Sequence, residues 1–146
     1  MDPKDFLDHI DDQAIVEAIR AAETRGRGEI RVHVTHQPVG DAQEAAIEAF
    51  ERLGMARTAE RNGVLILVVP RTNAFAIVGD QGVHLHCGAS FWKNVTEAMS
   101  AEFRAGRYTE AIRRGVERVG DELAQAFPRE PGRTDVNELP DSVSRD

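Results

Sequence analysis

Apolar residues follow one another without interruption from Val64 to Val69, so neither side of this stretch carries polar residues. A short apolar run of this kind is typical of a strand that is covered on both faces of a sheet. Ala74 to Val78 predicts a second strand, which follows the short loop from Pro70 to Asn73. Because a parallel return needs a long crossover, the two strands must pair antiparallel. We expect this hairpin at the centre of a sheet with helices on both sides.

The segments on either side of the hairpin show other spacings of apolar residues. Ile30 to Val34 alternates apolar and polar residues, which predicts a strand with one dry face that lies nearer the edge of the sheet. Apolar residues at helical spacing predict further helices. These predicted helices run from about 12 to 24, from 42 to 53, from 91 to 105 and from 108 to 126. The pattern between 79 and 88 is irregular, and Val83 to Leu85 is predicted to add a short strand.

The order of these elements predicts the fold class. A strand, a helix and a second strand in succession form a parallel pair through a right-handed crossover. The hairpin then adds an antiparallel strand to that pair. The sequence therefore predicts an α/β fold, a three-layer α/β/α sandwich with a small mixed sheet and helices on both of its faces.

The 146 residues are enough for one domain with a hydrophobic core. We expect this domain to span residues 1–127 and a polar, acidic tail to follow over residues 128–146. The tail combines Pro, Gly and charged residues with few apolar ones, so on its own it would be disordered. Leu139 and Val143 are its obvious apolar anchors.

The net charge of -7 argues against a dedicated nucleic-acid-binding protein. No apolar run approaches the ~20 residues of a membrane helix, and the N-terminus lacks the apolar segment of a signal peptide. The single cysteine, Cys87, allows no internal disulfide. We therefore expect a soluble, cytoplasmic protein, a monomer rather than an oligomer, with neither a nucleic acid nor a membrane as its partner.

Several short motifs together resemble a known family. They are RNGVLILV at 61–68, AIVGDQGVH at 76–84, FW at 91–92 and FRAGRYTEAI at 103–112. Over roughly residues 10–127 the chain resembles the TPM domain family, and it looks like the short, soluble bacterial branch of that family. The resemblance implies an α/β/α sandwich that binds a divalent cation, Ca²⁺ or Mg²⁺. For some members it also implies an acid phosphatase activity.

Oxygen-bearing side chains gather at the end of the sheet where the two parallel strands begin. Glu29, Asn62, Asp80 and His84 all fall there, because the antiparallel strand finishes at that end. Hard cations need several oxygen ligands at once, so Glu29, Asn62 and Asp80 are candidate metal ligands. The alternative is that Glu29 forms an ion pair with Arg61 and that Asp80 caps a turn.

The opposite end of the sheet carries a second candidate site. Asp41, at a helix N-terminus, could hold a cation, or with Arg71 it could hold a phosphate. The alternative for Asp41 is a plain helix N-cap. The tail could also fold back and supply one ligand, although a solvated tail is the simpler interpretation. Its candidate ligands are Asp135, Asn137, Glu138 and Asp141.

Two further features invite a chemical interpretation. His84 and His86 would share one face of the predicted short strand, but a transition-metal site needs further ligands. Cys87 could act as a nucleophile only with a base and an orienting group. The sequence has no phosphate-binding loop and no hydrolase nucleophile elbow. A phosphatase here would have to be metal-assisted.

Three functions follow from these patterns. We favour a divalent-cation-binding domain with a regulatory or interaction role, which acts through an unknown protein partner. The first alternative is a weak metal-dependent phosphomonoesterase, and the second is a purely structural interaction module. The cation-binding interpretation is preferred because the carboxylates lie scattered at the ends of elements and no nucleophile–base pair is visible.

Overall fold

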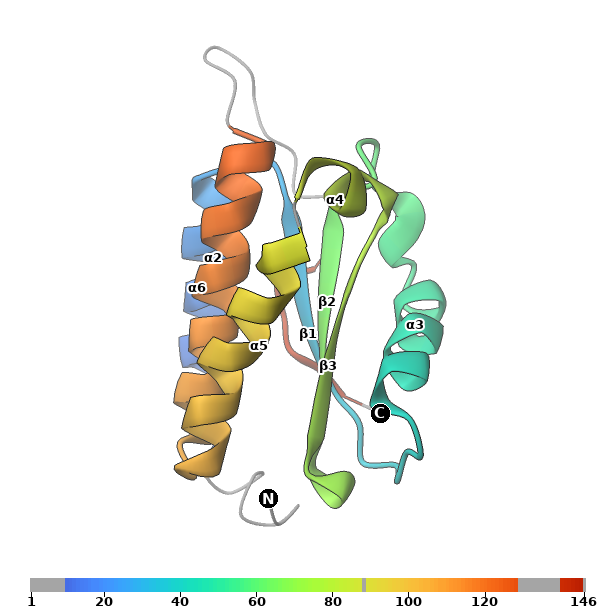
Figure 1. Cartoon of the computed structure of the whole chain (residues 1–146), viewed down its shortest axis with the longest axis vertical. Helices are drawn as coiled ribbons and strands as arrows, with labels where there is room; N and C mark the ends of the chain where they lie inside the picture. The colour runs from blue at the N-terminus through green and yellow to red at the C-terminus, as the bar shows by residue number, and fades with distance from the viewer. Residues whose placement is uncertain (1–9, 88, 129–139, 146) are drawn as a thin grey trace.

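A computed structural model of the chain describes residues 10–87, 89–128 and 140–145. Its core is a sheet with the strand order β3-β2-β1-β4, and helices lie on both sides of that sheet (Figure 1). The strands are β1 (Glu29–Val34), β2 (Gly63–Val69), β3 (Ala74–Gly79) and β4 (Ser144–Arg145).

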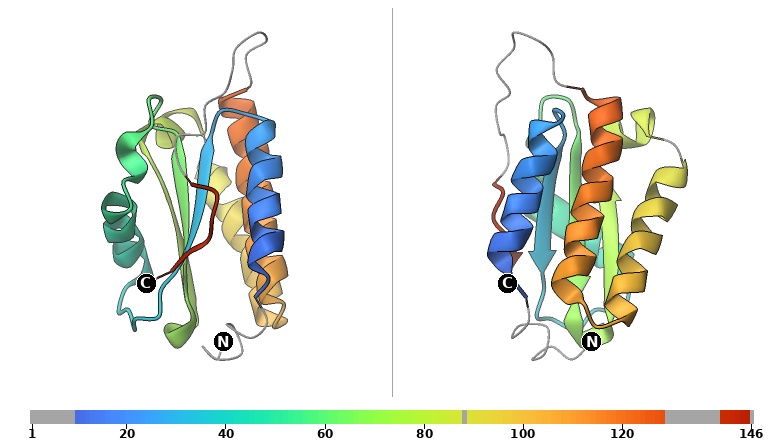
Figure 2. Two further views of the ribbon diagram at one scale, coloured as in Figure 1. Left: turned by 180° about the vertical axis from the view of Figure 1, so that it is seen from behind. Right: turned by 90° about the vertical axis from the view of Figure 1, so that its left-hand side faces the viewer.

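Three long helices cover one face of the sheet and a fourth covers the other (Figure 2). The first face packs against α2 (Asp12–Thr24), α5 (Ala89–Arg104) and α6 (Tyr108–Ala126). The second face packs against α3 (Ala42–Arg52). Short helices α4 (Gln81–His86), η1 (Met55–Arg57) and η2 (Pro70–Thr72) connect the larger elements. The predicted three-layer α/β/α sandwich is confirmed.

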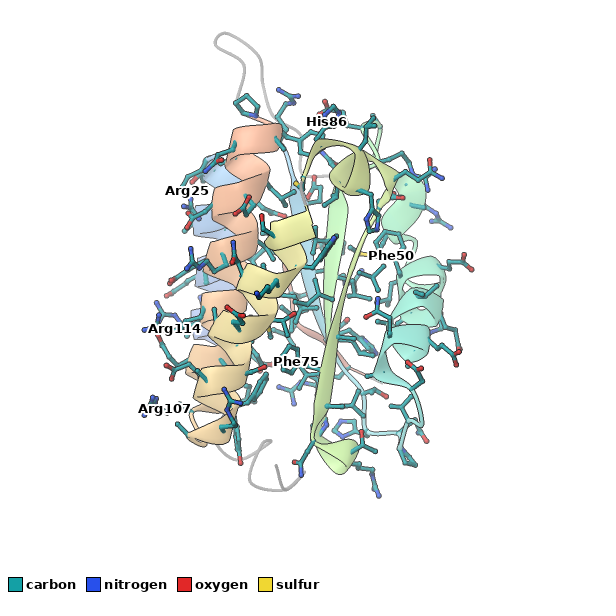
Figure 3. The ribbon with its side chains drawn as sticks, in the orientation of Figure 1. Arg25, Phe50, Phe75, His86, Arg107 and Arg114 are labelled. Atoms are coloured by element: carbon teal, nitrogen blue, oxygen red, sulfur yellow. The ribbon has the colours of Figure 1, made fainter. Side chains whose placement is uncertain are left out.

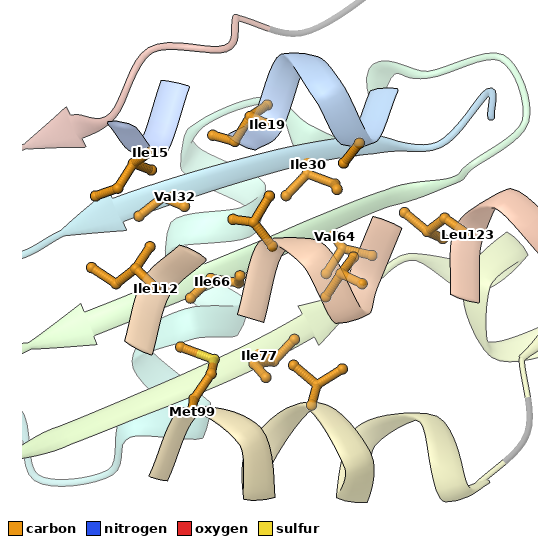
Figure 4. Close-up of a cluster of buried hydrophobic side chains, with 14 of the residues drawn as sticks. Ile15, Ile19, Ile30, Val32, Val64, Ile66, Ile77, Met99, Ile112 and Leu123 are labelled. Atoms are coloured by element: carbon orange, nitrogen blue, oxygen red, sulfur yellow. The ribbon is translucent and has the colours of Figure 1, made fainter. Parts of the chain in front are cut away.

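Every residue of β2 is buried, which explains its unbroken apolar sequence. Successive side chains of a strand point to opposite faces. Val64, Ile66 and Val68 therefore enter the core beneath α2, α5 and α6, where Figure 4 shows Val64 and Ile66 among the buried side chains. Leu65, Leu67 and Val69 enter the core beneath α3. With helices packed on both of its faces, β2 has no side that meets solvent.

The predicted strand pairings are confirmed, and the predicted positions of two strands within the sheet are wrong. β1 and β2 run parallel, whereas β2 and β3 form the antiparallel hairpin. However, β3 lies at an edge of the sheet, and β1, predicted nearer an edge, lies inside it. The reason is β4, in which Ser144 and Arg145 of the tail pair with His33 and Val34 of β1.

The short strand predicted at 83–85 is also wrong, because these residues belong to helix α4. Asp80 caps this helix through a side chain that accepts a hydrogen bond from the Gln81 amide. Gly82 then lies against the backbone of the preceding connection, where its own N–H donates to the Arg61 carbonyl at 2.9 Å. A Cβ atom on Gly82 would approach the Glu60 carbonyl oxygen to 2.4 Å, so the helix can dock here only with glycine.

Candidate functional site

The sheet register brings three of the predicted ligands to one end of the molecule. The Glu29 amide donates a hydrogen bond to the Asn62 carbonyl at 3.2 Å, and the Asp80 amide donates to the Gly63 carbonyl at 2.9 Å. Glu29, Asn62 and Asp80 are 3%, 1% and 5% exposed. Burial of an acid or an amide is costly unless a partner compensates it, so the surroundings of each side chain decide what it can do.

Asp80 is fully engaged by Arg61. Its Oδ2 accepts from Arg61 Nε at 2.7 Å, and its Oδ1 accepts from Arg61 Nη2 at 2.8 Å and from the Gln81 amide at 2.7 Å. The hydrogen bond to Asp80 raises the pKa of the Arg61 guanidinium. This bidentate pair occupies both carboxylate oxygens. Arg61 therefore pairs with Asp80 rather than with Glu29, and a cation at Asp80 would have to displace a guanidinium.

The side-chain amide nitrogen of Asn62 is hydrogen-bonded, whereas its side-chain oxygen has an unused acceptor. Its Nδ2 donates to the Arg27 carbonyl at 2.8 Å, and its backbone N–H donates to Thr58 Oγ1 at 3.1 Å. Its Oδ1 is buried and has no hydrogen-bond partner among the described residues. A buried amide oxygen without a hydrogen-bond donor is a suitable ligand for a hard cation.

A second group of carboxyls lies near Glu29, and its central member was not predicted from the sequence. Glu23, in the last turn of α2, accepts a hydrogen bond from the Ile30 amide at 3.0 Å and also bonds to Asp141. Burial, the hydrogen bond to Asp141 and the charges of Glu29 and Asp141 together raise the pKa of Glu23 to about 10, against the lowering effect of the hydrogen bond from the Ile30 amide. Glu23 therefore holds a proton at neutral pH.

The tail supplies Asp141 to this group. β4 lies beside β1, with Ser144 Oγ 2.6 Å from His33 Nδ1, and Val143 packs against the main core. Arg145 pairs with Asp12 of α2 at 2.5 Å, while Arg20 of α2 lies 3.6 Å from Asp141. For residues 140–145 the favoured prediction of a solvated tail is wrong, because this segment folds back and pairs with β1. Asp135, Asn137, Glu138 and Leu139 lie outside the described residues.

Asp41 and Arg71 lie at the opposite end of the sheet. Asp41 is the N-cap of α3, and its Oδ1 accepts from the Glu44 amide at 3.1 Å. Arg71 is exposed in η2, just after β2 ends. Both residues therefore lie far along the strands from Glu29 and Asp80, and a phosphate or cation site at Asp41 and Arg71 stays a prediction.

The histidine pair does not form a metal site. His84 and His86 lie on α4 rather than on a strand, and their rings contact Trp92 and Phe127 at centroid distances of 5.2 Å and 5.3 Å. Figure 3 shows His86 at the α4 end of the molecule. Across 10–87, 89–128 and 140–145, no three His, Cys, Asp or Glu side chains are arranged to hold a metal ion.

Cys87 follows α4, and its chemistry is unfavourable for a nucleophile. Burial and the charge of Glu122 raise the pKa of the thiol. At neutral pH the group is therefore a neutral thiol, and the thiolate is the reactive form.

Comparison with known proteins identifies the fold and the family. The family model of the TPM domain matches residues 1–122. The chain belongs to the TPM domain family. The BA42 protein from the psychrophilic bacterium Bizionia argentinensis is similar to this TPM domain, with 36% sequence identity and a TM-score of 0.85 over 92% of each chain.

More distant structures share the fold of this TPM domain. The N-terminal domain of a protein from P. gingivalis has a TM-score of 0.62 at 17% identity, over 76% of this chain and 72% of that one. The N-terminal domain of the cg2496 protein from Corynebacterium glutamicum has a TM-score of 0.57 at 14% identity, over 91% and 78%. A search of curated protein sequences returned no match. None of the described helices has both the length and the apolar character that crossing a membrane requires.

Proposed function

We propose that this TPM domain binds a divalent cation, Ca²⁺ or Mg²⁺, and that the bound cation regulates its interactions. The observation that supports the proposal is the contact between the hydrogen-bonded carboxyls of Glu23 and Asp141, where burial and this contact raise the pKa of Glu23 far above the usual range of a carboxylic acid. Two carboxylates in contact repel each other when both are ionised. A proton on Glu23 removes that repulsion here, although Arg20 lies 3.6 Å from Asp141, and a divalent cation can replace the proton.

The cation would take oxygens from the side chains around Glu23. Glu23 and Asp141 are in direct contact, and the charge of Glu29 acts on the same carboxyl. Asn62, whose backbone carbonyl accepts from the Glu29 amide, has a further buried oxygen in its Oδ1. Asp80 stays outside this set because Arg61 holds both of its oxygens.

Ca²⁺ suits this arrangement better than Mg²⁺. The ligands come from α2, from the start of β1 and from the tail, and the described side chains do not form a preformed metal site. Binding therefore requires the Glu23–Asp141 hydrogen bond to open and the side chains to rearrange. Ca²⁺ accepts a variable number of oxygens in flexible geometry, whereas Mg²⁺ demands a near-ideal octahedron.

A binding role is preferred over hydrolysis. The Cys87 thiol, with its raised pKa, is a poor nucleophile. The Asp80 carboxylate is engaged by Arg61 and the Gln81 amide, so it is not placed to activate a water molecule. Regulation follows from the position of Asp141, because a cation bound there would change how the tail lies along β1.

The experiment is a titration of the full chain with CaCl₂ and separately with MgCl₂, followed by calorimetry and thermal unfolding. We expect Ca²⁺ to raise the melting temperature, since a ligand at 100 times its Kd stabilises the folded state by about 2.7 kcal/mol. We also expect proton release on binding, because Glu23 must lose its proton. Repeating the calorimetry in buffers of different ionisation enthalpy measures that proton.

Three variants assign the site. Glu23→Gln keeps the size of the side chain and should abolish both the thermal shift and the proton release. Glu51→Gln, on the exposed side of α3, makes the same change away from the cluster and should bind as the wild type does. If neither cation shifts the wild-type melting temperature, the proposal fails. If Glu23→Gln still binds and Asp80→Ala does not, the cation belongs to Asp80.

A further inference from the structure

The two edges of the sheet differ. β4 covers the outer edge of β1, whereas no strand among the described residues pairs with the outer edge of β3. The Asp80 amide bonds to the Gly63 carbonyl, and hydrogen-bonded residues alternate along an antiparallel ladder. Ala74, Ala76 and Val78 therefore bond to β2. It follows that Phe75, Ile77 and Gly79 direct their backbone N–H and C=O groups away from the sheet.

One side chain already reaches this edge. Gln43 of α3 donates from Nε2 to the Ile77 carbonyl at 3.3 Å. An exposed carbonyl at a strand edge accepts the N–H of an added strand in the same way. The Gln43 amide thus occupies the place of a backbone donor, and a side chain of an α-helix can move aside when such a donor arrives.

The edge of β3 lies in a groove. A cavity of about 720 Å³ runs along it between α3 and α5, and a second of about 510 Å³ continues from it along α5. Both cavities share Asn73, Phe75 and Ser100, so they form one groove along the length of β3. We name it the β3-edge groove. Its walls are Gln43, Ile47, His84, Trp92, Thr96, Ser100, Phe103, Arg104 and Tyr108.

The charge of the β3-edge groove differs from that of the whole chain. The net charge is -7, yet among the described residues no Asp or Glu lines either cavity. Arg104 is exposed at the Phe75 end and makes no ion pair with any other described residue. Ile47, 49% exposed, and the ring of Trp92 make the other end apolar. The groove therefore suits an apolar ligand with a negative charge at one end.

We propose that the β3-edge groove binds an extended apolar peptide that ends in a carboxylate, and that this peptide adds a strand antiparallel to β3. Antiparallel pairing is the more stable arrangement per residue. It places the C-terminal end of the peptide beside Ala74 and Phe75, where β3 begins and where Arg104 lies. The six residues of β3 offer about 20 Å for pairing. This inference goes beyond the cation site, since its residues lie on the other edge of the sheet.

The test uses the full ¹⁵N-labelled chain and a set of N-acetylated hexapeptides. Each peptide has one lysine at its start for solubility, Val, Ile, Leu or Phe at alternate positions, and a free terminal carboxylate. We expect the best binders to shift the amide signals of Phe75, Ile77 and Gly79 and to slow their hydrogen exchange. Amidating the terminus of the same peptides should weaken binding by about fivefold or more, since an ion pair is lost.

Matched variants separate the charge from the groove. Arg104→Glu should weaken the free-acid peptides by about tenfold or more, whereas Arg118→Glu, an equal charge change on exposed α6, should change binding less than twofold. Ile47→Asp tests the opposite wall without touching the core, and it too should weaken binding.

Several results would overturn the inference. One is the absence of any peptide that shifts the three β3 amides. Another is equal binding of amidated and free-acid peptides, which would remove the role of Arg104. A concentration-dependent shift of Phe75, Ile77 and Gly79 without peptide would show instead that a second copy of the chain occupies the edge.

Discussion

Replacing Glu23 with glutamine should make the protein more stable at neutral pH and leave it unchanged in acid. The protonated acid accepts from the Ile30 amide and bonds to Asp141. Glutamine preserves this arrangement, because its amide oxygen accepts and its amide nitrogen donates. The substitution therefore removes the ionisation of the side chain while keeping its shape and its hydrogen bonds.

The expected magnitude comes from the pKa of Glu23, which is about 10 in the folded chain and 4.5 as an ordinary value. Between these two pH values the folded state binds one more proton than the unfolded state, so the free energy of unfolding falls as the pH rises. The slope is about 1.4 kcal/mol per pH unit. From pH 4.5 to pH 7 the wild type should thus lose about 3 kcal/mol through this group, and Glu23→Gln should lose none of it.

Urea unfolding of both proteins, followed by the fluorescence of Trp92 from pH 4 to pH 9, measures the difference. Trp92 is the single tryptophan of the chain, and it is half-buried on α5. Groups that do not interact with Glu23 titrate equally in both proteins, so the difference between the two profiles reports on Glu23 and its contacts with Asp141 and Glu29. The two free energies should agree near pH 4.5 and diverge steadily above it. Parallel profiles would mean that Glu23 is ionised in the folded chain, and the reasoning would be refuted.

Two further predictions concern the α4 region. Gly82→Ala should destabilise the fold by about 1–3 kcal/mol in urea unfolding, because its Cβ would press on the Glu60 carbonyl; Gly40→Ala, which meets nothing within 4 Å, should cost nothing or stabilise slightly, and equal effects would contradict the close packing. Cys87 should react with iodoacetamide at pH 8 more slowly than a free thiol, and Glu122→Gln should speed the reaction; no difference between the two proteins would exclude the charge of Glu122 as a cause.

The elements that the sequence predicted well are those whose burial is complete. β2 has helices on both of its faces, so its apolar run admits one interpretation. The hairpin follows from its short loop, in which Asn73 adopts a left-handed φ of 52°. α4 escaped prediction because its six residues are too few to show a helical period, and the Asp80 cap and the backbone contact of Gly82 determine it instead.

The candidate site was predictable only in part, because it depends on contacts between distant segments. Register alone brings Glu29 and Asn62 together, so the sequence could find them. It could not show that Arg61 forms its ion pair with Asp80 rather than with Glu29, since both acids lie at the same end of the sheet. In the sequence Glu23 resembles any acid near the end of a helix. Its raised pKa depends on burial and on contact with Asp141, which belongs to the tail, and the composition of the tail predicted a solvated segment.

The two-residue strand β4 has a kinetic consequence. Its contact between His33 and Ser144 joins residues 111 apart in sequence, so the chain must close a very long loop to make it. We expect such distant parallel pairing to form late in folding, after local pairings such as the β2–β3 hairpin. So short a ladder also detaches at a fraction of the free energy of global unfolding. The protein should therefore populate a native-like species in which the rest of the sheet is intact and Asp141 has left Glu23.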